Sequence, residues 1–148
     1  MRLLVLFLLV AWPCWAQEDP ISVVGEFRVY RNHSGYAAGR TGQTRIHVVG
    51  TVNKVSEAVV RKFKVKAVIV NPVDGQVIGQ TAENVHRVLN KGRPVEFEYD
   101  WYTPPALDNH PAFVVQIVYL YQDRNNKEYS GLTNLRFNED PNYVPVNR

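Results

Sequence analysis

The sequence predicts an all-β fold, a single two-layer antiparallel β-sandwich of about seven strands, and three observations support this prediction. From Ile21 onward, apolar residues alternate with polar ones at every second position, and β-branched residues are frequent. No window combines the residue spacing of an amphipathic helix with helix caps at its ends. With 148 residues, of which 45% are hydrophobic and 21% charged, the chain has the length and composition of one globular domain.

Clusters of glycine, asparagine, aspartate and proline divide this alternating sequence into the predicted strands. In chain order the strands are Ile21–Arg31, Thr44–Val52, Val59–Val70, Gln76–Val88, Pro94–Tyr102, Ala112–Gln122 and Glu128–Phe137. Asp74-Gly75 is the clearest hairpin signal, because this pair suits a tight turn. Prolines bound the segment Pro104–Pro111 and cannot join a central ladder, so we expect this segment to cross between the sheets. Strands of this number and spacing favour a sandwich of immunoglobulin-like type.

The first residues have the pattern of a cleaved secretory signal peptide. Arg2 precedes an apolar run over Leu3–Trp12, and cleavage is expected after the small residue Ala16. The run is shorter than the ~20 residues of a transmembrane helix, so we predict no transmembrane segment and a periplasmic or secreted protein. Lipid anchoring at Cys14 is the alternative, which the bulky residues just before the cysteine disfavour. The predicted divisions are a signal peptide over 1–16, a sandwich domain over 17–137 and an extended tail over 138–148.

Cysteine usage and charge exclude several classes of function. Cleavage would remove the only cysteine, and with it any disulfide or cysteine-based zinc site. Such a domain is more typical of a bacterial periplasm or surface than of small animal extracellular modules. The 17 basic and 14 acidic residues give a net charge of +3 without a clustered basic stripe, which argues against nucleic-acid binding. The four histidines lack ligand-like spacing and no serine stands in a nucleophile elbow, so we predict no metal, no cofactor and no enzyme activity.

Turn residues and core alternation follow a recognisable order in the middle of the chain. Val49-Gly50-Thr51-Val52-Asn53 is followed by Ser56 and Val60, then by Asp74-Gly75-Gln76-Val77-Ile78-Gly79, and finally by Leu89-Asn90-Lys91-Gly92 before Val95-Glu96-Phe97. In these residues the chain resembles the bacterial FxLYD-type domain and its immunoglobulin-like relatives, over about residues 44–102. The resemblance implies a small, exported, non-catalytic β-sandwich of the bacterial envelope.

Two predicted strands carry charged residues at alternate positions. Glu96, Glu98 and Asp100 alternate with three aromatic residues, which predicts carboxylates on a solvent face and rings in the core. Carboxylates at this spacing could instead serve a small secreted hydrolase, which we keep as a weaker alternative. The matching basic row consists of Lys62, Lys64 and Lys66. This row is interpreted as a solvated face that resists aggregation, or as a docking surface for an anionic polymer or an acidic partner.

Three further regions are candidate interaction sites. The glycine-rich loop over residues 33–43 carries Tyr36 and Arg40, and a loop of this composition on a rigid sandwich suits recognition. Trp101 is interpreted either as the core tryptophan of the sandwich or, with Tyr102, as a platform for a glycan. The strand Ala112–Gln122 is apolar on both faces, so the tail or a partner protein must cover the second face. The apolar residues of that second face are Val114, Val118 and Leu120.

Together these features favour an exported, non-catalytic module that mediates protein–protein interaction or assembly in the bacterial cell envelope. Its expected partner is an envelope protein. A module that binds a glycan or another envelope polymer, through the Tyr36 loop and Trp101 with Tyr102, is the alternative.

Overall fold

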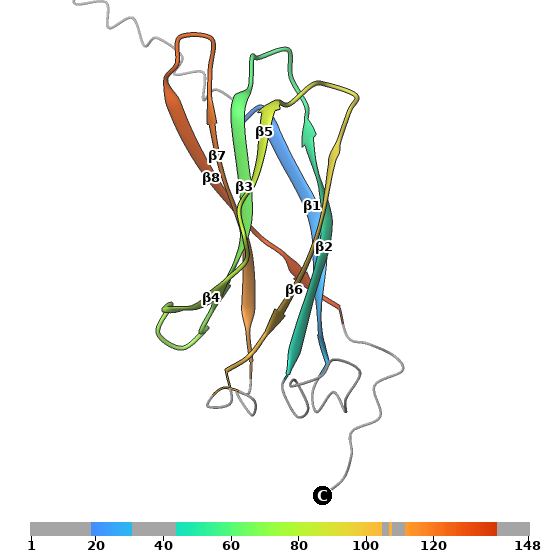
Figure 1. Cartoon of the computed structure of the whole chain (residues 1–148), viewed down its shortest axis with the longest axis vertical. Coiled ribbons are helices and arrows are strands. Elements are labelled where there is room, and N and C mark those ends of the chain that lie inside the picture. The colour runs from blue at the N-terminus through green and yellow to red at the C-terminus, as the bar shows by residue number, and fades with distance from the viewer. Residues whose placement is uncertain (1–18, 31–43, 105–106, 108–111, 139–148) are drawn as a thin grey trace, which may run out of the picture.

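The computed structural model describes residues 19–30, 44–104, 107 and 112–138. The strands of these residues form two sheets that pack face to face, so the predicted all-β sandwich is confirmed (Figure 1). The signal peptide, the loop that carries Tyr36 and Arg40, and all of the predicted tail after Asn138 lie outside the described residues.

The first sheet has four strands in the order β6-β2-β1-β9. Its strands are β1 (Ile21–Tyr30), β2 (Arg45–Lys54), β6 (Val95–Tyr102) and β9 (Arg136–Phe137). β2 lies antiparallel between β1 and β6. The short β9 runs parallel to β1, with Arg136 opposite Glu26. The sandwich is therefore antiparallel except at this one described edge.

The second sheet has five strands, and β7 lies at its centre between β3 and β8. Its strands are β3 (Arg61–Val70), β4 (Val77–Gln80), β5 (Asn84–Val88), β7 (Val114–Gln122) and β8 (Glu128–Asn134). β4 and β5 both pair with β3 on the side away from β7. The chain passes from β6 in the first sheet to β7 in the second, so the predicted crossing at the proline-bounded segment is confirmed.

Nine strands are present in the described residues instead of about seven, because two predicted strands are divided. The predicted strand Gln76–Val88 breaks at Thr81, whose hydroxyl accepts a hydrogen bond of 3.0 Å from the amide of Ala67 and so takes the place of a ladder carbonyl. The predicted strand Glu128–Phe137 breaks at Leu135, whose side chain is buried and whose amide donates to the carbonyl of Val115. After Leu135 the chain joins the other sheet.

Alternate residues of the two sheets meet in one apolar core. Phe63 and Ile69 of β3, Ile117 of β7, and Ile46 and Val48 of β2 are fully buried in it. Side chains that share a face lie two positions apart on each strand, which is the period that the sequence predicts. The second sheet thus turns one face to the core and leaves the other outside.

Aromatic rings lie directly against three glycines of the sandwich. The pairs are Phe97 on Gly50, Trp101 on Gly79 and Tyr119 on Gly131. A Cβ atom at any of these glycines would overlap the ring, so the missing side chain makes room for it. These contacts fix where the three large rings sit between the sheets.

Candidate interaction surfaces

The outer face of the second sheet exposes apolar side chains beside a row of lysines. Leu132 of β8 lies opposite Val118 of β7, and Lys66 of β3 lies opposite Val118 on its other side. In the next row Leu120 of β7 lies opposite Lys64. Leu120 is 42% exposed and Leu132 is 54% exposed, while Val118 is half-buried. We call this surface the lysine face; it comprises Lys62, Lys64, Lys66, Val118, Leu120 and Leu132.

The lysines of this face differ in what they contact. The ammonium of Lys64 lies 3.3 Å from the carboxylate of Glu83. The ammonium of Lys66 donates to the side-chain carbonyl of Gln80 over 3.0 Å. Lys62 is exposed at a break in the register of β3 and has a φ of 49°, in the left-handed region. Lys62, Lys64 and Leu120 border a surface hollow of about 280 Å³.

The remaining residue of the predicted partner surface, Val114, lies apart from these side chains. It begins β7 opposite Val70 and is half-buried. Val118 and Leu120 lie further along the strand, where they border the lysine row. The structure therefore brings together two of the three apolar residues predicted for this face and adds Leu132, which sequence reasoning missed.

The outer face of the first sheet carries the carboxylates of β6. Glu96, Glu98 and Asp100 are exposed, while Phe97 and Tyr99 are buried between the sheets, so the predicted division of β6 into a charged and an aromatic face is confirmed. Val49 and Thr51 of β2 lie opposite Glu98 and Glu96. The outward residues Val49, Thr51, Glu96 and Glu98 border a shallow hollow of about 480 Å³. We call this surface the carboxylate face; it comprises Val49, Thr51, Glu96, Glu98 and Asp100.

Asp100 is the most strongly held of these carboxylates. Its Oδ1 accepts a hydrogen bond of 2.7 Å from Nε of Arg45 and lies 2.8 Å from Nδ1 of His47. Partial burial alone would raise the pKa of Asp100, but the bonds from Arg45 and His47 outweigh it, and the pKa lies below its usual value. Glu98 lies 3.7 Å from Nε2 of the same histidine. Asp100 is thus part of a local ion-pair cluster, whereas Glu96 has no such contact among the described residues.

Trp101 and Tyr102 point to opposite sides of their sheet. Trp101 lies opposite the buried Ile46, packs against the core and rests on Gly79 of β4. Tyr102 lies opposite Arg45 on the outer side. The two rings therefore do not form one platform, and the geometry favours the alternative in which Trp101 is a core residue.

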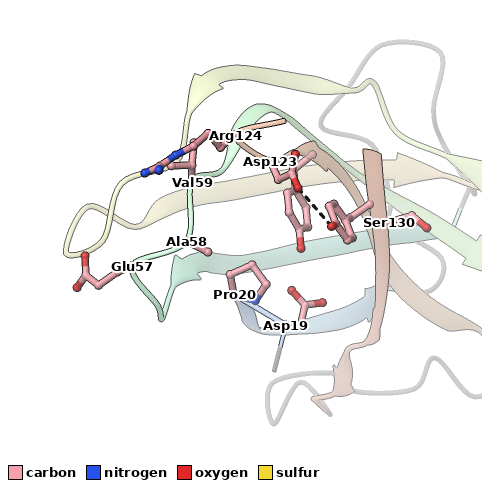
Figure 2. A pocket seen from close by; sticks show the side chains of 10 residues that line it. Asp19, Pro20, Glu57, Ala58, Val59, Asp123, Arg124 and Ser130 are labelled. Carbon is pink, nitrogen blue, oxygen red and sulfur yellow. Dashed lines mark hydrogen bonds between the residues drawn. The ribbon is translucent and has the colours of Figure 1, made fainter. Parts of the chain in front are cut away.

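A pocket of about 400 Å³ opens at the end of the sandwich where β1 begins (Figure 2). It is bordered by Asp19, Glu57, Asp123, Arg124 and Ser130, with Tyr121 and Tyr129 on its wall. These residues come from three segments far apart in the sequence, so no local motif predicted the pocket. The segments are the start of β1, the β2–β3 loop and the hairpin formed by β7 and β8.

Asp19, Asp123 and Tyr129 of this pocket already form hydrogen bonds within the protein. Asp123 accepts hydrogen bonds from the amides of Asn125 and Lys127 and from the hydroxyl of Tyr129. Burial tends to raise the pKa of Asp123, but these bonds lower it below the usual value. The Tyr129 ring stacks on Tyr121 at 5.2 Å and also carries the Lys127 ammonium at 5.2 Å. The Tyr129 ring is therefore already occupied by contacts within the protein.

The carboxylate of Asp19 is engaged in the same way. It accepts a hydrogen bond from the hydroxyl of Tyr119 and another from the amide of Ile21 over 3.0 Å. Burial, and next the bond to Asp19, raise the pKa of Tyr119 well above its usual value. Tyr119 thus acts as a hydrogen-bond donor that ties β7 to the start of β1.

The described part of the chain contains neither a candidate metal site nor a candidate membrane-spanning helix. Its His, Cys, Asp and Glu residues form no group of three that could hold a metal ion. No helix within the described ranges is long and apolar enough to cross a membrane.

Comparisons with known proteins bear on the fold alone. No family model and no curated protein matches the sequence, so the FxLYD-type resemblance stays a prediction. Among solved structures, the ApaA protein of Bordetella pertussis matches with a TM-score of 0.52 and 11% identity, over 83% of this chain and 95% of that one. A Niemann-Pick type C2 protein of the Japanese carpenter ant matches with a TM-score of 0.38 and 14% identity, over 79% and 93% of the two chains. The first likeness supports the sandwich fold, and the second carries no argument.

Proposed function

We propose that this chain is an exported, non-catalytic β-sandwich that binds another protein in the bacterial cell envelope, and that the lysine face is its docking surface. The observation that carries the proposal is the exposure of Leu120 and Leu132 beside the half-buried Val118, on and next to the central strand of the second sheet. A central strand that keeps apolar residues on its outer side leaves apolar area that a partner can bury.

The free energy available from burying the apolar side chains of the lysine face is large enough to contribute measurably to binding. Burying a leucine side chain contributes about 1.5–3 kcal/mol, and the lysine stems can pack along the same apolar surface while their ammonium groups stay in water. Two leucines and a valine therefore offer a central apolar contact, and the lysines around them select a partner that carries carboxylates.

The last described residue, Asn138, lies against the first sheet and away from the lysine face. The amide of Asn138 donates to the carbonyl of Phe27 on β1, and the side-chain amide of Asn138 donates to Glu26 over 2.9 Å. These contacts support a separate protein as the occupant of the lysine face.

The test compares two variants of the full chain in a bacterial host. The face variant carries Val118→Thr and Leu120→Thr, and the control carries Val73→Thr, which changes a valine that is 86% exposed in the turn between β3 and β4, outside both outer faces. Each tagged variant is cross-linked in the cell envelope, and the captured proteins are quantified. We expect one captured envelope protein to fall by at least about tenfold with the face variant, since about 1.4 kcal/mol of lost burial gives this factor, and to persist with the control.

The proposal is wrong if the folded face variant captures the same proteins in the same amounts as the wild type. Fractionation of the host gives a second check, because the proposal requires the chain to be found outside the cytoplasm.

A further inference from the structure

The two outer faces of the sandwich carry opposite uncompensated charges. On the lysine face, Lys62 contacts no carboxylate within salt-bridge distance in the described structure, and Lys66 contacts only an amide. On the carboxylate face, Glu96 lacks a basic partner among the described residues, and the side chain of Glu98 is 72% exposed with only His47 nearby. Each face therefore leaves charge that the other could neutralise.

Several of the remaining charges of each face are paired within that face. Glu83 neutralises Lys64, while Glu128 on β8 accepts a hydrogen bond from Gln122. On the other sheet Arg45 is paired with Asp100, and Arg28 with Glu26 over 3.3 Å. Apart from Glu128, whose bond is to an amide, these groups add little to the field of either face.

Each face also has apolar side chains that the other face could cover. On the lysine face, Leu120 is 42% exposed and borders the hollow of about 280 Å³ together with Lys62 and Lys64. On the carboxylate face, the hollow of about 480 Å³ lies between Glu96 and Glu98 and includes the side chains of Val49 and Thr51. Stacking the lysine face of one molecule on the carboxylate face of another therefore brings Leu120 and its neighbouring lysines against Val49, Thr51 and their neighbouring glutamates.

We propose that a second copy of this chain occupies the lysine face, docked head to tail through its carboxylate face. This inference rests on the proposed function and names the partner. A contact between two different surfaces of one chain is heterologous, so a docked pair still has one open lysine face and one open carboxylate face, and further copies extend it into a row or close it into a ring. Contact between two lysine faces is disfavoured, because like charges would meet.

The size of the contact sets its expected strength. Strands about 4.8 Å apart, with a rise of about 3.3 Å per residue, present about 16 Å² per residue. The four strands of the first sheet have 10, 10, 8 and 2 residues, so their outer face has an area of about 500 Å². A stable interface usually buries about 800 Å² on each partner, so the head-to-tail contact is weak and assembles only as the concentration rises. Screening by salt weakens it further, because the selecting charges are exposed.

The experiment uses two charge reversals in the full chain. One variant carries Lys62→Glu and Lys66→Glu, and the other carries Glu96→Lys and Glu98→Lys. Each variant alone has two outer faces of like charge. In an equimolar mixture, every contact between the two variants pairs opposite charges again. The control, Arg93→Glu with Arg124→Glu, makes the same change in net charge as the lysine variant at two exposed turn positions outside both faces.

Sedimentation velocity over a concentration series is the measurement, with circular dichroism to establish that each variant is folded. We expect the wild type and the control to associate reversibly as concentration rises, each reversal to weaken association by at least about tenfold, and the mixture to restore it. The inference is overturned if the wild type stays monomeric at about 1 mM. It is also overturned if the two folded charge-reversal variants associate no more strongly in the mixture than each does alone. If a monomeric wild type still loses a captured partner through Val118→Thr and Leu120→Thr, the proposed function stands and only the identity of the partner is wrong.

Discussion

The contact between Trp101 and Gly79 allows a sharp test of how the two sheets are held together. Trp101 lies on β6 of the first sheet and Gly79 lies on β4 of the second, so the contact joins the edge strands of both sheets. A Cβ added at Gly79 would lie 2.7 Å from the indole Nε1 of Trp101 and would overlap the neighbouring ring carbons. The ring is rigid, so Gly79→Ala must displace it.

The size of the effect follows from two opposing terms. Overpacking of this kind costs about 1–3 kcal/mol, whereas replacing glycine by alanine at a compatible backbone position gains about 0.4–1 kcal/mol from the unfolded chain. We therefore expect Gly79→Ala to lower the free energy of unfolding by about 1–2 kcal/mol. In a Trp101→Leu background the obstacle is gone, and the same substitution is expected to be neutral or slightly stabilising.

Urea unfolding of the four proteins in this cycle, followed by far-ultraviolet circular dichroism, measures the coupling between the two positions. We expect the double variant to be more stable than the sum of the single effects predicts, by at least about 1 kcal/mol. Additive effects within about 0.5 kcal/mol would refute the reasoning, because they would mean that the indole does not rest on β4 in solution.

Two other expectations concern Asp100 and Asp123. Because the pKa of Asp100 lies below its unfolded value of about 3.9, its stabilisation is present above that pH and is lost as the pH falls through the folded-state pKa. Asp100→Asn should therefore lower the free energy of unfolding by up to about 1 kcal/mol at neutral pH. In acid unfolding, the difference in this free energy between the variant and the wild type should shrink below pH ~4. A difference that does not change with pH would contradict this expectation. Asp123→Ala should speed amide hydrogen exchange at Asn125 and Lys127, because the Asp123 carboxylate accepts hydrogen bonds from both amides. The control Asp74→Ala should affect only the β3–β4 turn, where Asp74 accepts a hydrogen bond from the amide of Gln76. Unchanged exchange at Asn125 and Lys127 would show that Asp123 does not hold its turn.

The faces of the strands could be predicted from the sequence because a strand has a period of two. The alternation along β6 was enough to place Phe97 and Tyr99 inside and Glu96 and Glu98 outside. The same period places the neighbours Trp101 and Tyr102 on opposite sides, so their failure to form a platform could also have been predicted. The local alternation of residue types determines which face of the sheet each side chain points to, and in β6 it does so correctly.

Features that depend on contacts between distant segments could not be read in the same way. Neither Thr81 nor Leu135 is a glycine or proline that would mark a break, and their bonds to Ala67 and Val115 are what divide the predicted strands there. The pocket beside Asp19 and Asp123 depends on three segments meeting at one end of the sandwich. The exposure of Leu132 depends on β8 lying beside Val118. Register and sheet membership decide these features, and neither is encoded in one stretch of sequence.

The parallel pairing of β9 with β1 has a consequence for the order in which the protein folds. Glu26 and Asn138, which are bonded at this edge, stand 112 positions apart in the chain. The outer edge of the first strand therefore stays open until nearly all of the described chain has been synthesised, and a contact of such high sequence separation forms late and slowly. Until then β1 presents unpaired backbone groups that can pair with a strand of another chain. Keeping the nascent chain unfolded until its last strand is available therefore protects it from aggregation. Closing this edge is thus a late step of folding, and truncation before Arg136 should trap the chain in an aggregation-prone state.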